Sequence, residues 1–129
     1  MNVLDRALQL GLGISHITAW LGMGGEVVDK QTSQERADIC NGDNPTGRRC
    51  EMNREGTIVT GKVADAVRLT LEAKNKLELR VSGERMLGRC EACGCVLRLL
   101  VHEPQARIKE QITDEERKLL PDWCWKLKP

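Results

Sequence analysis

The sequence predicts a small α+β domain in which two or three helices surround a short β element, preceded by an apolar helical arm. A C-x-x-C-G turn at Cys90–Gly94 is followed by an apolar run, and helical periodicity recurs elsewhere in the chain. Residues 7–25 contain no Asp, Glu, Lys or Arg. We expect the arm to comprise residues 1–28 and the folded domain to comprise residues 29–129.

The composition indicates a globular chain with a thin core. Charged residues make up 30% of the 129 residues and hydrophobic residues 40%, and the net charge is +1. This balance gives no whole-protein argument for binding nucleic acid or a membrane surface. Phe and Tyr are absent and Trp occurs three times, so Leu, Val, Ile, Ala and Cys must build the core. Thin cores are often supplemented by metals, disulfides or oligomerisation.

The uncharged segment of residues 7–25 is long enough to be considered as a membrane span, but its composition argues against one. It contains five glycines and several polar residues, which would make a poor lipid-exposed helix. Two short amphipathic helices fit the pattern better. The arm either packs on its own domain or docks onto a protein partner or a second copy through residues 1–25, and we expect no membrane insertion.

Capping and periodicity place the helices and loops that follow the arm. Thr32–Glu35 has the pattern of a capping box that starts a helix running to about Cys40, and residues 41–47 form a polar loop. Apolar residues recur every four positions over residues 57–76, which is the longest predicted helix. Residues 77–81 alternate with period two, which indicates a strand or an extended exit from that helix, although the helix could instead continue to Arg80.

The C-terminal part is predicted to contain one strand and one helix. The apolar run Val96–Val101 indicates a strand that anchors the cysteine turn in the core and stops before Pro104. Residues 105–112 are expected to be irregular. Thr113–Glu116 forms a second capping box, which opens a short helix that Pro121 ends.

The cysteines are the strongest chemical signal in the chain. No signal peptide is recognisable at the N-terminus, so we expect a reducing compartment, where closely spaced cysteines bind metal more often than they form disulfides. The C-x-x-C-G turn aims two thiolates at one ion, and zinc suits it at least as well as an iron–sulfur cluster. We predict one or two zinc ions on Cys40, Cys50, Cys90, Cys93, Cys95 and Cys124.

Three ligand sets remain open. One zinc ion could bind Cys40, Cys50, Cys90 and Cys93; one could bind Cys90, either Cys93 or Cys95, Cys124 and an upstream cysteine; or two ions could share all six thiolates. Cys124 lies between Trp123 and Trp125, whose indoles are expected to shield the site from water. His102 could complete a three-cysteine site, but a strand-end histidine facing water is the favoured interpretation.

A closed four-thiolate site leaves no open position for a substrate, so the predicted metal is structural rather than catalytic. The sequence shows no histidine with a carboxylate partner at readable spacing, no phosphate-binding loop and no nucleophile elbow. We therefore predict that the protein is not an enzyme.

Several segments together resemble a group of small, mostly uncharacterised cysteine-rich proteins encoded by tailed bacteriophages. The matching segments follow the same order over most of the chain and are Trp20–Gly25, Arg36–Gly42, Cys50–Asn53, Leu87–Leu97 and Trp123–Trp125. The upstream cysteine pair departs from the expected close C-x-x-C, because here it opens to Cys40 and Cys50. The resemblance implies a phage origin and six metal-site cysteines, and it implies no established activity.

Two functions follow as expectations. The first is a non-enzymatic, zinc-stabilised structural component of the virion that docks through its N-terminal arm. The second is a zinc-ribbon-like module that binds a host protein or nucleic acid in the host cytoplasm during infection. For nucleic acid, the candidate phosphate contacts are Arg48, Arg49, Arg54, Arg85, Arg89 and Arg98.

Overall fold

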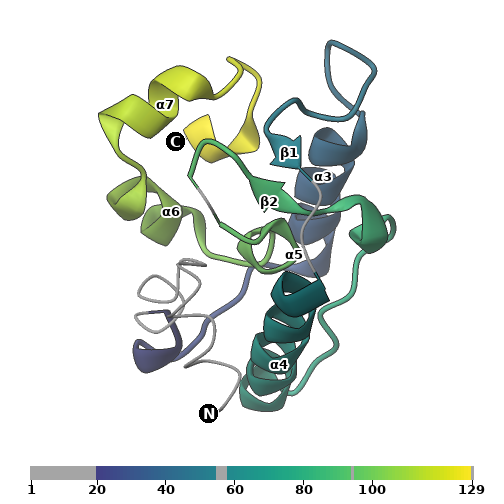
Figure 1. Cartoon of the computed structure of the whole chain (residues 1–129). Coiled ribbons are helices and arrows are strands. Elements are labelled where there is room, and N and C mark those ends of the chain that lie inside the picture. Colours follow the sequence, from purple (N-terminus) through teal and green to yellow (C-terminus); the bar gives the residue numbers. More distant parts are fainter. Residues whose placement is uncertain (1–19, 55–57, 94, 129) are drawn as a thin grey trace.

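The computed structural model describes residues 20–54, 58–93 and 95–128, which form a small α+β fold (Figure 1). Its elements in chain order are α3 (Lys30–Asn41), β1 (Asn53–Arg54), α4 (Ile58–Asn75), the 3-10 turn η1 (Glu84–Met86), β2 (Arg89–Cys90), α5 (Leu97–Leu100), α6 (Gln105–Gln111), α7 (Asp114–Leu119) and the 3-10 turn η2 (Trp125–Leu127). In Figure 1, α3 and α4 lie along one side and α6 and α7 along the other, with the sheet between them. The predicted α+β class is confirmed, but the described residues contain five α-helices where two or three were predicted. No described helix is both long and apolar enough to cross a membrane.

The sheet consists of two short antiparallel strands, and a buried amide ties it to its surroundings. Asn53 of β1 pairs with Cys90 of β2. The Asn53 side chain donates from Nδ2 to the carbonyls of Cys40 (3.3 Å) and Met86 (3.0 Å), and its Oδ1 accepts from the Gly88 amide (2.9 Å). Because a buried polar group is costly unless it is hydrogen-bonded, these contacts fix the end of α3, η1 and the start of β2 relative to one another.

Two clusters of buried apolar side chains form the core. The larger cluster joins α3, β2, α5, α6 and the C-terminal segment, and its buried members are Ala37, Cys40, Val81, Leu87, Cys90, Ala92, Leu97, Leu100, Val101, Ile108, Leu120, Cys124 and Trp125. The smaller cluster packs α4 against α5, and its buried members are Trp20, Ala64, Val67, Leu71, Leu79, Val96 and Leu99. Aliphatic residues and cysteines dominate both clusters, as the absence of Phe and Tyr requires.

The apolar run after the cysteine turn forms a helix, so the predicted strand over Val96–Val101 is wrong. Val96 forms an isolated antiparallel bridge with Arg89 of β2. The Leu97 amide then donates to the Gly88 carbonyl (2.9 Å), where α5 begins. Leu97 belongs to the larger cluster and Leu99 to the smaller one, so a single helical turn reaches both. Periodicity alone does not distinguish a short buried strand from a short buried helix.

The predictions for the start of α3 and for residues 105–112 are also wrong. α3 starts ahead of the Thr32–Glu35 pattern, because Asp29 is its N-cap and accepts a hydrogen bond from the Thr32 amide (2.7 Å). Residues 105–112 are largely helical rather than irregular, since α6 begins directly after Pro104. Proline is well suited to this position, because its missing N–H would have no partner within the helix.

The longest helix and the last capping box are confirmed. α4 ends at Asn75, and residues 77–81 follow it without helix or strand structure, so the strand alternative and the continued helix are both wrong for that segment. Thr113 and Glu116 exchange side chain to backbone hydrogen bonds at the start of α7 (3.1 and 3.2 Å).

The described end of the predicted arm packs on the folded domain. Trp20 is 1% exposed within the smaller cluster, and its indole Nε1 donates to the Glu26 carbonyl (2.7 Å). Gly25 has a φ of 63°, and a Cβ there would lie 3.0 Å from a methyl group of Leu71, so glycine permits the close approach to α4. Residues 1–19 lie outside the described part of the chain, and the domain boundary after residue 28 stays a prediction.

Replacing Trp20 by Ala should lower the free energy of unfolding by about 3–5 kcal/mol, because it empties the site of a large buried side chain. Urea unfolding followed by circular dichroism measures the change. Leu69→Ala is the matched control, because Leu69 lies on α4 and is 65% exposed; it should change stability by less than about 0.5 kcal/mol. If Trp20→Ala were as mild as the control, the packing of Trp20 on the domain would be contradicted.

Candidate functional site

The backbone brings the cysteine-bearing segments to one place. The Cys50 amide donates to the Cys40 carbonyl (3.0 Å), which closes the polar loop between them. The Cys90 amide donates to the Cys95 carbonyl (2.9 Å), which closes the Cys90–Cys95 turn. The Glu91 amide donates to the Met52 carbonyl (2.7 Å), which joins this turn to the segment after Cys50. Cys124 is the N-cap of η2 and belongs to the larger core cluster, together with Cys40 and Cys90.

The six thiols form two groups, one of Cys90, Cys93 and Cys95 and the other of Cys40, Cys50 and Cys124. Hydrogen bonds link Cys90 to Cys93 and Cys93 to Cys95 within the cysteine turn. Cys40 interacts electrostatically with both Cys50 and Cys124. Cys124 also interacts electrostatically with Cys90, and both residues belong to the larger core cluster. We call these six residues the cysteine cluster; all of them are free thiols and four are buried.

Lys126 places its ammonium group in the cysteine cluster. The residue is 3% exposed, and its ammonium nitrogen lies 5.6 Å from the centroid of the Trp125 ring. Burial opposes the charge, but interactions with Cys93, Cys90 and Cys124 outweigh it and raise the pKa of Lys126. Its charge also acts on Cys40 and Cys95. One buried cation therefore faces sulfur atoms of both thiol groups.

The thiols differ in how strongly they hold their protons. Burial raises the pKa of Cys40 to about 11, although the Trp125 indole donates a hydrogen bond to its sulfur (3.3 Å). The hydrogen bond to Cys93, followed by burial, raises the pKa of Cys90. Cys95 accepts a hydrogen bond from Cys93, which lowers its pKa. Most of the cluster is therefore held as neutral thiols near neutral pH, and binding a metal would have to release their protons.

Trp125 covers one side of the cysteine cluster. Its ring is 2% exposed and lies 4.7 Å from the Arg36 guanidinium and 5.6 Å from the Lys126 ammonium, measured to the ring centroid. Arg36 is itself held by the carbonyls of Val101 (3.1 Å) and Glu103 (2.6 Å). The predicted shielding by two indoles thus applies to Trp125, whereas Trp123 is partly buried and lies outside the buried core clusters.

The side-chain arrangement by itself does not define a metal site. Among the residues that the structure describes, no three His, Cys, Asp or Glu side chains are positioned to hold a metal ion. The buried ammonium group of Lys126 interacts electrostatically with Cys90, Cys93 and Cys124, which are three of the six predicted ligands. The zinc prediction and the choice among the three ligand sets therefore stay predictions.

His102 is buried, so the favoured prediction of a water-facing side chain is wrong. It is 2% exposed, and its Nδ1 lies 2.9 Å from the Ser33 hydroxyl of α3. Both residues border a pocket of about 310 Å³ beside the start of α3. Burial lowers the pKa of His102 to about 4, so the ring is neutral at neutral pH.

Sequence reasoning missed Lys126 and Arg36. Lys126 stands in a short basic tail, Trp125–Lys128, whose pattern indicates a solvated end of the chain. Arg36 occupies an ordinary helical position in α3. The proximity of Arg36 to Trp125 and the burial of Lys126 depend on contacts between residues far apart in the chain, which the spacing of residues does not report.

No known family model matches the chain, and no similar curated protein and no similar solved structure was found.

Replacing His102 by Asn should remove a pH dependence of stability. In the wild-type protein His102 has a pKa of about 4 when folded and about 6.5 when unfolded, so the unfolded state binds the proton more readily between these values. Stability should fall by about 2 kcal/mol from pH 7 to pH 5, and His102→Asn should abolish this part of the loss.

The measurement is urea unfolding of both proteins at several pH values between 5 and 7, where most carboxylates stay ionised. Glu84 and Glu72 raise the pKa of His102 while Arg68 and Arg36 lower it, so these charges partly offset one another. Equal pH dependence in the variant and the wild type would contradict a buried neutral His102.

Proposed function

We propose that this protein is a non-enzymatic structural component of a tailed-phage particle, stabilised by zinc on its cysteine cluster and docked through the residues that precede Trp20. The observation that carries the proposal is that Cys40, Cys90, Cys93, Cys95 and Cys124 all lie in or against the larger core cluster, while the Cys50 amide donates to the Cys40 carbonyl (3.0 Å). The phage origin rests on the sequence resemblance. Until assembly, we expect the chain in the host cytoplasm.

Zinc is the metal that this donor set favours. Thiolates are its usual ligands in structural sites, where four of them surround the ion in a tetrahedron. Cys90 and Cys124 belong to the same core cluster and Cys93 packs against it, so we expect these three residues to be ligands with Cys40 or Cys50 as the fourth. When bound, the ion would cross-link four chain segments, which supplements a core that lacks Phe and Tyr.

The described residues offer little support for an enzyme. Ser33 and His102 are the pair that most resembles a nucleophile and its base, but Ser33 is 1% exposed and its hydroxyl also lies 3.3 Å from the Asp29 carbonyl. The buried pair links α3 to the segment after α5. A second hydrogen bond, from the Val28 amide to the His102 carbonyl (2.9 Å), strengthens this link. We therefore assign this pair a structural role.

The docking element in this proposal is shorter than the predicted 1–25. Trp20 is buried against α4 and α5, so it belongs to the folded domain and anchors whatever precedes it. The remaining uncharged residues, 7–19, are those available for a partner protein or a second copy.

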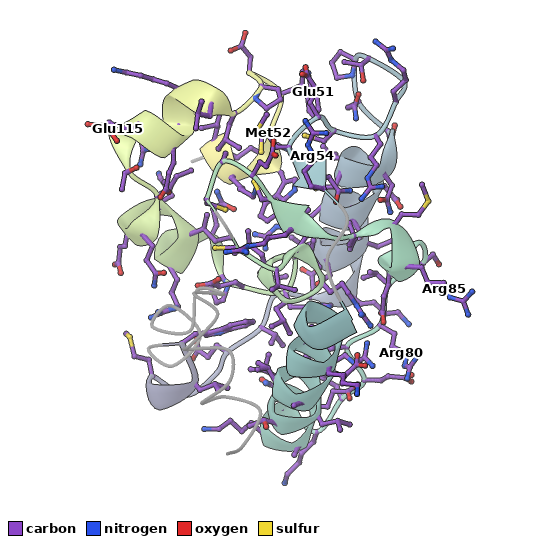
Figure 2. The ribbon with its side chains drawn as sticks, in the orientation of Figure 1. Glu51, Met52, Arg54, Arg80, Arg85 and Glu115 are labelled. Carbon is purple, nitrogen blue, oxygen red and sulfur yellow. The ribbon has the colours of Figure 1, made fainter. Side chains whose placement is uncertain are left out.

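Nucleic-acid binding is the alternative function, and the arginine positions favour it less. Arg98 is committed to ion pairs with Asp65 (3.0 Å) and Glu84 (3.0 Å). Arg54 pairs with Glu91 (3.2 Å). Figure 2 shows Arg54 at the β1 end of the molecule, well apart from Arg85 on η1.

Deleting residues 1–18 should remove the protein from assembled particles and leave its stability within about 1 kcal/mol of wild type, because Trp20 is retained. Mass spectrometry of purified particles measures incorporation, and urea unfolding measures stability. The control is full-length protein with Arg48→Gln and Arg85→Gln, which changes two exposed arginines and should still be incorporated.

Normal incorporation of the truncated chain would contradict docking through the arm. Absence of the full-length protein from particles would contradict the virion function itself. In that case a gel shift at low salt would test the nucleic-acid alternative, since phosphate contacts weaken as salt rises.

A further inference from the structure

We propose that the segment between α4 and η1, residues 77–81, is an open strand edge on which a second copy of this chain pairs in antiparallel orientation. The pairing centres on Leu79 of both copies. This surface is separate from the cysteine cluster and from the residues before Trp20, so the inference goes beyond the proposed function. Two observations carry it, namely backbone groups without partners along one edge of the segment and an order of charges that is complementary to itself.

The segment has the side-chain alternation of a strand, although no described strand pairs with it. Leu79 and Val81 are buried, at 3% and 9% exposure, and belong to the smaller and the larger core cluster. The side chains of Glu78 and Arg80 are 73% and 64% exposed and form an ion pair (3.3 Å). Side chains two residues apart therefore share one face, as they do in a strand.

One edge of the segment is already used within the chain. The Leu79 amide donates to the Glu72 carboxylate of α4 (2.8 Å), and the Leu77 amide donates to the Glu72 carbonyl (3.3 Å). In a strand the backbone groups of successive residues point to opposite edges, so those of Glu78 and Arg80 face the other edge. Within the described part of the chain, these two residues make no backbone hydrogen bond. Such a row of amides and carbonyls is a template for another strand.

The segment also lies where a partner can reach it. Figure 1 shows it at the outer side of the fold, where it runs back along α4 towards η1. Figure 2 shows Arg80 at this edge of the molecule. A pocket of about 310 Å³ borders Leu77–Arg80 and the start of α3, so there is unfilled space beside the segment.

The order of charges favours a second copy as the partner. In antiparallel pairing about Leu79, Glu78 of each copy lies opposite Arg80 of the other copy. Opposite charges at directly opposed positions stabilise an antiparallel pair, and like charges destabilise it. Because Glu78 and Arg80 carry the free backbone groups, the two residues of each pair exchange both of their N–H to carbonyl hydrogen bonds. A two-fold axis through Leu79 thus matches one surface with itself.

The contact is short, so we expect a weak dimer in equilibrium with the monomer. Interfaces that bury less than about 1,200 Å² are typical of weak and transient complexes. The expected Kd lies between about 10 μM and 1 mM.

The test uses the full chain and the variants Glu78→Arg and Arg80→Glu, studied by sedimentation equilibrium at protein concentrations below and above this range. Wild-type protein should pass from monomer to dimer. Each variant alone places like charges opposite each other at both paired positions, so it should associate at least about tenfold more weakly. An equimolar mixture of the two variants restores opposite charges at both positions and should form a heterodimer with about the wild-type affinity.

The matched control is Arg85→Glu, which makes the same change of charge at an exposed residue of η1 and should associate like wild type. Circular dichroism checks the fold of each variant, which should be unchanged because the replaced side chains are exposed. Amide hydrogen exchange is a second readout. The Glu78 and Arg80 amides of the wild-type protein should exchange more slowly at high protein concentration than at low concentration.

A wild-type protein that stays monomeric over the whole range would overturn pairing between copies and would leave the edge to an extended peptide of another protein. Wild-type association in both single variants would also overturn it, because the dimer contact would then lie elsewhere on the chain. Weakened single variants whose mixture does not recover would contradict the pairing of Glu78 with Arg80.

Discussion

Lys126 carries its ammonium group into a core built from aliphatic side chains and cysteines. Few side chains are more costly to bury, and the segments that meet beside this one carry cysteines. Cys90 and Cys93 come from the turn after β2, Cys124 precedes η2, and Cys40 ends α3. The larger core cluster therefore depends on an electrostatic contact as well as on apolar burial, and any ligand of the thiols must accommodate this cation.

The rest of the fold brings these segments to the same point. The Asn53 amide ties β1 to η1 and to the end of α3, which sets the position of the Cys50 loop relative to the Cys90 turn. α5 then connects the cysteine-bearing core to the smaller cluster around α4 and Trp20. Arg68, Arg98 and Glu84 form an ion-pair network that fastens η1 to α4 and α5. A chain without Phe or Tyr thus gains rigidity from satisfied polar groups at the junctions between its elements.

The sequence revealed the features that depend on local patterns and missed those that depend on tertiary contacts. The period of α4 and the capping box of α7 are local, and both were predictable. The run Val96–Val101 was not, because a buried apolar segment of this length suits a strand or a helix equally. The cysteines were recognised as a group from their number and spacing. The buried positions of Lys126 and His102 arise from the packing of segments that are distant in the chain, and the spacing of residues does not predict them.

We propose that the cysteine cluster holds a structural metal. Native mass spectrometry of the freshly purified full-length protein, with and without a chelator, tests it most directly. The account predicts a mass increase of one or two zinc ions that the chelator removes, with a shift to the higher charge states of an unfolded chain. A metal-free protein that keeps its compact charge states, or a mass about six protons light from three disulfides, would contradict it.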